Sequence, residues 1–156
     1  MSVFIRPALA SDAHSVGQLA RQFAIYLREL GDPTEFRLTA GAYLRDGFGT
    51  APAFAGLVAE YEGNVIGYLL YHFGYDSDAA TRNMHIVDLY VEHAVRKRGV
   101  GRALMIQAAS ISREAGAEEM IWSVYNRNAL AATFYASIGA QRITDVFFMR
   151  LKAAAI

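Results

Sequence analysis

Residues 88–102 read DLYVEHAVRKRGVGR, which predicts a strand, a short basic loop and a glycine pair that opens a helix. Glycine has no Cβ, so the backbone at Gly99 and Gly101 can approach a ligand closely, and the first N–H groups of a helix lack partners within the helix. The three cationic side chains of residues 96–98 add positive charge. We therefore predict that residues 96–101 bind an anion of the pyrophosphate type.

A basic tripeptide followed by glycine can also be a solvated loop at the end of a strand, so the flanking segments decide between the two interpretations. Residues 84–92 are mostly apolar and predict a central strand. Residues 99–115 carry apolar side chains at helical spacing and stop at Gly116, which predicts a helix. A strand that leads through glycines into a helix is the context that an anion-binding motif requires.

The chain has 156 residues, of which 54% are hydrophobic and 19% charged, and this predicts one domain, residues 1–156. Its 15 basic and 15 acidic side chains cancel, so no overall field attracts nucleic acid or an anionic membrane. The absence of cysteine excludes disulfides, thiolate metal sites and a cysteine acyl-enzyme. The histidines lack metal-ligand spacing, so no metal is expected. The amino terminus lacks a signal-peptide pattern, from which we expect a cytoplasmic protein.

Apolar periodicity and turn residues predict the element order β, α, α, β, β, β, α, β, α, β. Residues 62–64 (EGN) predict a hairpin turn, and residues 76–83 predict a polar loop. The order indicates an α/β (α+β) fold in three layers. A Rossmann domain and a P-loop are excluded by the place of the glycines and the lack of a following Lys-Ser/Thr. The expected strands are residues 3–6, 54–61, 65–73, 84–92, 120–125 and 142–151, and the expected helices are 12–30, 39–44, 99–115 and 128–138.

Two motifs of the chain resemble those of the GNAT superfamily of N-acetyltransferases. Arg96-x-x-Gly99-x-Gly101 is similar to the family's acetyl-CoA signature, Q/R-x-x-G-x-G/A. Residues 128–140, NALAATFYASIGA, resemble its N-x-x-A-x-x-F-Y-x-x-x-G-A segment. Further stretches, among them LRDGFG, LVAE and IGYLLYHFGYD, are similar in order and spacing to the diamine (spermidine/spermine) acetyltransferase branch. The resemblance covers most of the chain.

The resemblance implies a mixed, mostly antiparallel central sheet with helices on both faces, in which the fourth and fifth strands are parallel and splay apart. It also implies that acetyl-CoA lies in that splay, with its pyrophosphate at the helix that follows the glycines and its pantetheine paired with the fourth strand. The residues that it assigns to acetyl-CoA are Leu89, Tyr90, Val91, Arg96, Lys97, Arg98, Gly99, Val100, Gly101, Arg102, Asn128 and Ala131.

Acetyl transfer to an amine requires a neutral nitrogen, a stabiliser for the oxyanion and a proton for the leaving thiolate. An alkyl ammonium with a pKa near 10.4 is neutral in only about one molecule in a few thousand at pH 7, a deficit of roughly 4 to 5 kcal/mol. The resemblance implies that Tyr135 is the general acid, and the backbone N–H of Leu89 or Val91 is the expected oxyanion donor. Without the motif around it, Tyr135 would be interpreted as a packed helix tyrosine.

The general base is harder to assign. In the branch that the chain resembles, a glutamate immediately precedes the aspartate of the fourth strand, whereas this chain has Val87 before Asp88. A second acidic position of that branch, after the tyrosine of the first helix, falls on Leu27 after Tyr26. The loss of both carboxylates disfavours a long polycation and favours a smaller amine, such as an amino acid side chain or a thialysine-like compound.

His85 is the expected replacement base, because it precedes Val87 by two residues and would share its strand face at about 7 Å, close enough to act through water. The alternatives are His72, Asp76 and Glu92, and each of the four also has an ordinary structural interpretation. The residues expected at the acceptor amine are Tyr26, Val87, Asp88 and Trp122, with core packing as the alternative role of Trp122.

Three functions are compatible with the sequence. The first is an acetyl-CoA-dependent N-acetyltransferase that acts directly on a primary amine of a small molecule, namely a diamine, an amino acid or a thialysine-like compound. The second is a protein acetyltransferase that acts on lysine or an N-terminus, and the third is a catalytically weak acyl-CoA-binding sensor. The resemblance also implies a homodimer, for which the apolar strand expected around residues 146–149 is suited.

Overall fold

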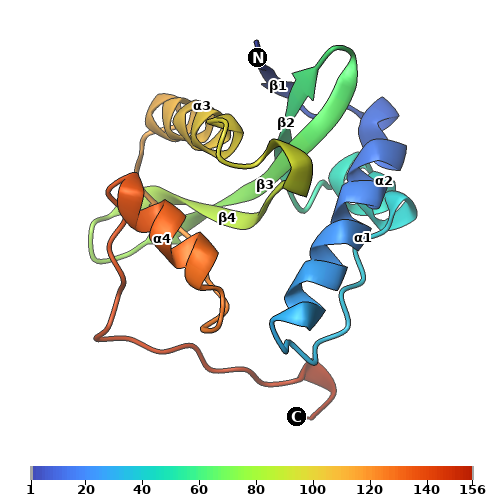
Figure 1. Cartoon of the computed structure of the whole chain (residues 1–156). Coiled ribbons are helices and arrows are strands. Elements are labelled where there is room, and N and C mark those ends of the chain that lie inside the picture. The colour runs from blue at the N-terminus through green and yellow to red at the C-terminus, as the bar shows by residue number, and fades with distance from the viewer. Residues whose placement is uncertain (1, 156) are drawn as a thin grey trace.

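The computed structural model describes residues 2–155 (Figure 1). Its strands are β1 (Phe4–Pro7), β2 (Ala55–Tyr61), β3 (Asn64–Asp76), β4 (Thr81–Val91) and β5 (Ala117–Ile121). Its α-helices are α1 (Ala13–Glu29), α2 (Ala40–Gly47), α3 (Val100–Glu114) and α4 (Ala129–Ser137). No helix in the described part of the chain is long and apolar enough to cross a membrane.

The strands form one sheet in the order β1-β2-β3-β4-β5. Neighbouring strands are antiparallel as far as β4, and β5 joins β4 in the parallel direction. Tight turns connect β2 to β3 and β3 to β4, whereas the parallel pair needs α3 as a crossover. The predicted mixed, mostly antiparallel sheet is confirmed.

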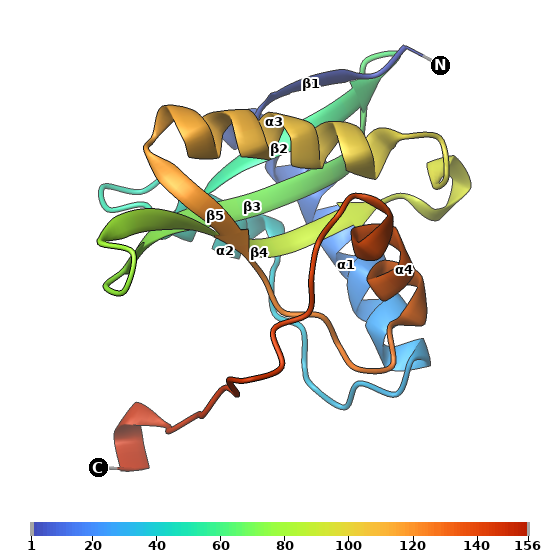
Figure 2. The same ribbon diagram turned by 90° about the vertical axis from the view of Figure 1, so that its left-hand side faces the viewer.

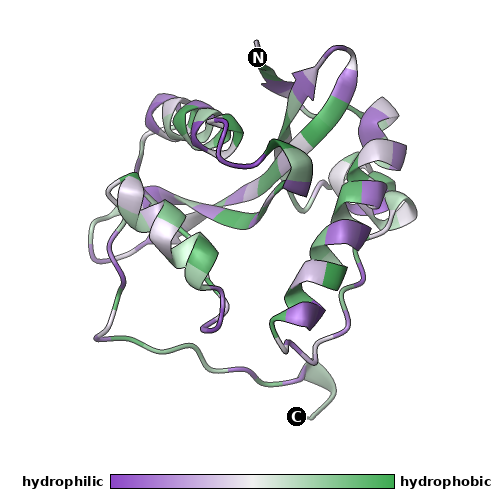
Figure 3. Ribbon diagram, viewed as in Figure 1, coloured by the Kyte–Doolittle hydropathy of each residue, from purple (hydrophilic) through white to green (hydrophobic). Residues whose placement is uncertain are grey.

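Helices cover both faces of the sheet, as predicted (Figures 1 and 2). Tyr68 and Leu70 of β3 are buried with α1 and α2, whereas Leu69 and Tyr71 are buried with α3. Successive residues serve opposite cores because side chains alternate along a strand. Figure 3 shows hydrophilic and hydrophobic residues alternating along α1, which is typical of a helix with one buried stripe.

A β-bulge in β4 decides which of its side chains face each core. Leu70 pairs with Asp88 and Tyr71 pairs with Ile86, so Val87 is an extra residue without a partner on β3. Asp88 therefore lies on the α1 face together with Leu70, whereas Ile86 belongs to the core under α3.

β4 and β5 separate beyond the pair of His85 with Ile121, which is the last pair between them. Residues 86–91 of β4 consequently have no partner strand on this side within the described chain. Half of their backbone N–H and C=O groups face the opening, and apart from the carbonyl of Val91, which accepts a hydrogen bond from Arg96, they have no partner strand to bind. The predicted splay of the fourth and fifth strands is confirmed.

Two predicted boundaries around the sheet are wrong. Residues 76–83 were expected to form a loop, but β3 and β4 keep pairing until Asp76 meets Thr81, and only a tight turn remains. The fifth strand occupies Ala117–Ile121 instead of residues 120–125, because its pairing with β4 stops where the splay begins.

The strand expected over residues 142–151 is also wrong. Residues 141–152, here called the C-terminal arm, run away from the sheet and pair with none of its strands (Figure 2). A strand needs a neighbour for its backbone hydrogen bonds, and β-forming side chains cannot supply one. Large apolar side chains of the arm are 58% to 86% exposed, and they are Ile143, Val146, Phe147, Phe148, Met149 and Leu151.

Candidate functional site

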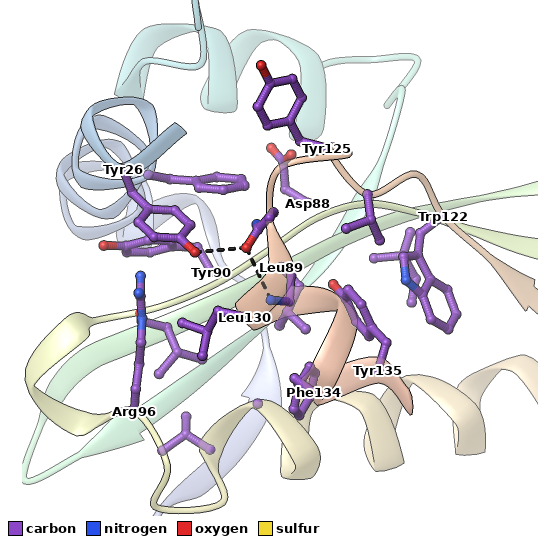
Figure 4. A pocket seen from close by; sticks show the side chains of 18 of the residues that line it. Tyr26, Asp88, Leu89, Tyr90, Arg96, Trp122, Tyr125, Leu130, Phe134 and Tyr135 are labelled. Atoms are coloured by element: carbon purple, nitrogen blue, oxygen red, sulfur yellow. Dashed lines mark hydrogen bonds between the residues drawn. The ribbon is translucent and has the colours of Figure 1, made fainter. Parts of the chain in front are cut away.

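A cavity of about 930 Å³ lies at the splay, between β4, the start of α3, α4 and the second half of α1 (Figure 4). Its lining includes every predicted site residue except His85 and Arg98. The backbone of residues 86–91 is part of that lining, on the edge of β4 that β5 leaves free. Segments far apart in the chain thus meet around one opening.

The residues of the predicted anion cradle lie at the N-terminus of α3. It follows Gly99 directly, and the φ of 85° at Gly99 is a conformation that other residues adopt only with strain. A Cβ at Gly99 would meet no atom within 4 Å, so the turn is open, and the side chains of Lys97 and Arg102 lie nearby in the lining. Free helix N–H groups beside two cations suit an anion. Gly101 has a packing role, because a Cβ there would lie 3.3 Å from Phe134.

Arg96 is held in place by its neighbours. Its guanidinium lies over the rings of Tyr26 and Tyr90, at 4.7 and 5.1 Å from their centroids, and its Nε donates to the carbonyl oxygen of Val91 at 2.9 Å. The side chain therefore fixes the loop after β4 and keeps a positive charge at the cavity wall. Arg98 is exposed and takes no part in the lining.

A hydrogen bond connects α1 to α4 along the cavity. The Oδ1 of Asn128 accepts the backbone N–H of Ala131 at 3.1 Å, which caps α4, and the hydroxyl of Tyr26 donates to the same oxygen at 2.8 Å (dashed lines in Figure 4). Asn128 and Tyr26 were predicted to serve the cofactor and the acceptor, respectively, and here they are in contact. Their bond fixes the start of the helix that carries Tyr135.

Tyr135 lies in an apolar setting, with its ring centroid 4.9 Å from that of Trp122 and 5.1 Å from that of Phe134. Burial, together with the charge of Asp88, raises the pKa of Tyr135 to about 12. The hydroxyl therefore keeps its proton at neutral pH. Figure 4 shows it pointing from α4 toward Leu89 on β4. This arrangement suits a group that donates a proton beside the free edge of the strand.

Asp88 has an unusual environment for a carboxylate. Its pairing with Leu70 continues the regular register of Tyr90 with Tyr68, so it lies on the α1 face of β4, where it lines the cavity. Burial raises the pKa of Asp88 to about 7, with no hydrogen bond or ion pair from the described residues to oppose the effect. A carboxyl group in this state exchanges its proton near neutral pH.

His85 lies outside the cavity. Its ring stacks on that of His72, with 4.9 Å between centroids and 8° between planes, and burial together with the charge of His72 lowers the pKa of His85. The expected shared face with Val87 assumed unbroken alternation along the strand, which the bulge interrupts. The structure thus separates the predicted base from the other site residues.

Sequence reasoning missed some residues of the lining. Asp32 follows α1, and Tyr125 belongs to the segment between β5 and α4, so both reach the cavity from loops that carry no motif. Asp32 and Asp88 are the two acidic side chains of the lining. No local pattern could have found Asp32, because only the packing of α1 beside β4 brings it there.

Comparison with known proteins gives a consistent picture. Residues 20–140 match the family model described as acetyltransferase (GNAT) family. A thialysine N-epsilon-acetyltransferase of Bos taurus is 32% identical over 151 residues, which are 92% of this chain and 86% of that protein. A spermidine/spermine N(1)-acetyltransferase-like protein 1 of Homo sapiens is 31% identical over 143 residues, 87% of this chain and 20% of that protein.

Solved structures share the fold. An integron cassette protein from V. cholerae superimposes with a TM-score of 0.81 at 23% identity, covering 98% of this chain and 94% of that one. A ribosomal-protein-alanine N-acetyltransferase from Brucella melitensis has a TM-score of 0.77 at 20% identity, covering 97% of this chain and 100% of that one. At these identities the likeness concerns the arrangement of the elements alone.

Proposed function

Because the chain belongs to the acetyltransferase (GNAT) family and is an N-acetyltransferase, we propose that its acceptor is a primary amine of a small molecule, acetylated directly from acetyl-CoA. The observation that carries this proposal is the cavity at the splay, where a helix N-terminus with two cations, a strand edge without a partner strand and a half-buried tyrosine that keeps its proton come together. We assign this activity to one domain, residues 1–156, and to the cytoplasm, where acetyl-CoA is available.

Acetyl-CoA, which supplies the acetyl thioester, suits the residues of the cavity. The open turn at Gly99 and the first N–H groups of α3 would hold the pyrophosphate, with charge from Lys97 and Arg102. The free edge of residues 89–91 would pair with the pantetheine, and Asn128 would lie on the thiol side next to the start of α4.

The chemistry of the transfer falls to groups of the chain that line this cavity. Tyr135 holds a proton at neutral pH and would give it to the departing sulfur. A backbone N–H of Leu89 or Val91, on the edge of β4 that has no partner strand, would stabilise the oxyanion. Both groups are fixed before the substrate binds, because β4 is a sheet strand and the Tyr135 ring is packed against aromatic neighbours.

The acceptor amine would enter beside Tyr26, Val87, Asp88 and Trp122, all of which line the cavity. Its two acidic side chains can pair with one or two ammonium groups, which favours a diamine or a lysine-like compound over a long polycation. The related proteins named for thialysine and for spermidine/spermine agree with an amine on a short flexible chain.

The test is thiol release from acetyl-CoA with a panel of acceptors: thialysine, lysine, ornithine, putrescine, spermidine and a lysine-containing peptide. We expect turnover of at least one small amine, with a kcat/KM at least about tenfold above that of the peptide. Turnover of the peptide alone would indicate a protein acetyltransferase. Binding of acetyl-CoA without turnover of any acceptor would indicate a sensor.

We also propose that the protein is a homodimer that pairs through the C-terminal arm. A groove of about 300 Å³ lies between α3, β5 and the end of α4, and within the described chain the outer edge of β5 has no partner. An arm from a second copy could add a strand to this edge and bury its apolar side chains in the groove. Such pairing would supply the neighbour that the expected last strand lacks.

Sedimentation equilibrium tests this pairing. We expect wild type at twice the chain mass of 17.1 kDa, and we expect the double variant Phe147→Glu, Phe148→Glu to be monomeric because buried charges oppose the association. Ile25→Glu is the matched control, since Ile25 is a 55% exposed apolar residue on α1, and it should leave the dimer intact. A wild type that stays monomeric at every concentration would refute the proposal.

A further inference from the structure

Two carboxylates line the cavity, and their settings differ. Asp32 lies on an exposed turn, where its Oδ1 accepts the backbone N–H of Thr34 at 2.9 Å. Asp88 is half-buried on β4 and accepts no hydrogen bond from the described residues. A carboxylate that is partly withdrawn from water and has no partner is costly, so its presence in the wall of the proposed amine cavity calls for a functional reason.

We propose that Asp88 is the general base that removes the proton of the acceptor ammonium. This inference rests on the proposed amine acetylation, and it assigns the general base, for which the sequence left several candidates. In the acetyltransferase branch that the chain resembles, a glutamate occupies the position of Val87. We place the general base at the next residue, Asp88. The register of β4 supports this, because Asp88 pairs with Leu70 and Tyr90 pairs with Tyr68 in an unbroken run, so Asp88 shares the α1 face with Tyr90. The bulge at Val87 begins only beyond Asp88 and moves Ile86 to the core under α3.

The groups around Asp88 leave it unpaired. Tyr68, on the neighbouring strand, is deeply buried, and its hydroxyl is without a hydrogen-bond partner among the described residues. The charge of Asp88 acts on Tyr68 and Tyr135, which places both tyrosines close to it. The other titratable side chains of the cavity are Tyr26 and Asp32 from α1 and its end, Tyr90 on β4, His93, Arg96, Lys97 and Arg102 toward α3, and Tyr125 before α4. None of the cations among them offsets the burial of Asp88.

Burial shifts the pKa of both groups in the proton transfer, the carboxyl of Asp88 and the acceptor ammonium. A carboxylate of ordinary pKa is a weak acceptor for a proton held with a pKa near 10.4. Burial raises the pKa of Asp88 to about 7, and the same apolar setting lowers the pKa of an ammonium that enters it. The two values approach each other, which is the condition for efficient general base catalysis near neutral pH.

In the proposed reaction each bond that forms is matched by one that breaks. The ammonium gives one proton to the Asp88 carboxylate, and the free nitrogen lone pair forms the C–N bond to the thioester carbonyl carbon. As the C–S bond breaks, the sulfur takes the hydroxyl proton of Tyr135, and the new amide nitrogen releases a second proton that restores Tyr135 through solvent. Asp88 then returns its proton to solvent, so the sum is an amide, a thiol and one released proton.

The kinetic test compares wild type with Asp88→Asn over a range of amine concentrations between about pH 5 and pH 9. We expect kcat/KM of wild type, which reports the free enzyme, to rise with pH as Asp88 ionises, with a midpoint near its pKa of about 7. Asp88→Asn should lower kcat about 100-fold and abolish this step, while acetyl-CoA affinity stays within about twofold. A residue that only anchors the ammonium would instead raise KM and leave kcat and its pH profile unchanged.

Two further variants test other candidates for the general base. Glu92→Gln removes a carboxylate from just beyond the end of β4, outside the cavity, and His85→Gln removes the base expected from the sequence. Both should keep the pH step. Loss of the step in either one, or a normal step in Asp88→Asn, would overturn the inference while the proposed function stands. A wild type that acetylates no amine overturns the proposed function, and the inference with it.

Thermal unfolding gives a readout that needs no activity. The folded pKa of Asp88 lies above its ordinary value of 3.8, so the folded state loses stability as pH rises from about 4 to about 7. Asn has no such titration, so the Tm of Asp88→Asn minus that of wild type should grow over this range and level off above it. A difference in Tm that is constant with pH would show that Asp88 titrates normally and would overturn the inference.

Discussion

Tyr135→Phe is expected to lower kcat for the best amine by about 100- to 10,000-fold, which is the range that a positioned general acid contributes. The hydroxyl is lost, but the aromatic ring keeps its contacts with Trp122 and Phe134. Acetyl-CoA affinity should therefore stay within about threefold of wild type, since the interaction removed is made in the transition state. Thiol release measures the rate, and titration calorimetry measures the affinity.

The matched control is Tyr71→Phe, which removes a hydroxyl from a buried tyrosine on the α3 side of the sheet, outside the cavity. It should leave kcat unchanged. The pKa of about 12 for Tyr135 adds a second expectation: loss of this proton cannot lower the wild-type rate at neutral or mildly alkaline pH. A Tyr135→Phe variant that turns over at the wild-type rate would remove Tyr135 from the mechanism.

The fold was predictable because its signals are local. The turn at residues 62–64, the helical spacing after Gly99 and the apolar strand before it each depend on a few neighbouring residues, and the structure contains the hairpin, α3 and β4 that they predict. The splay between β4 and β5 was implied by the resemblance alone. It needs information that no short pattern holds, namely that β5 pairs with β4 only as far as His85.

The bulge could not be predicted from the sequence, and it accounts for the main misjudgement at the site. Val87 is β-branched and apolar and fits an unbroken strand, so counting by two placed His85 on its face. One extra residue in the ladder instead shifts Ile86 and His85 to the faces opposite those that unbroken alternation gives them, while Asp88 keeps the face of Tyr90. The partial burial of Asp88 could not be predicted either, because segments distant in the chain form the cavity around it.

The C-terminal arm shows that strand propensity alone does not predict whether a segment joins a sheet. Its β-forming residues indicate a preference for extended backbone, but residues 141–152 lie outside every helix and strand of the described chain. Whether such a segment becomes a strand depends on a partner, and the described sheet offers none on the arm's path. Propensity therefore indicated a strand in the arm but could not show that a partner for it is missing.

Gly99→Ala is expected to weaken acetyl-CoA binding by about tenfold or more, because its Cβ would occupy the open side of the turn where the pyrophosphate would approach the N–H groups of α3. The variant also forces alanine to a φ of 85°, at a cost of about 1 kcal/mol in folding free energy. Calorimetry measures the affinity, and denaturant unfolding measures the stability.

A glycine beyond the C-terminal end of α3 can distinguish the effect of backbone strain from the effect on binding. Gly116, just after the other end of the helix, has a φ of 74°, and a Cβ there would likewise meet nothing within 4 Å. Gly116→Ala should therefore lose a similar folding free energy and bind acetyl-CoA like wild type. If both variants lose stability equally and neither loses affinity, Gly99 only starts a helix, and the anion must bind elsewhere. A loss of affinity confined to Gly99→Ala would locate the pyrophosphate at the turn between β4 and α3.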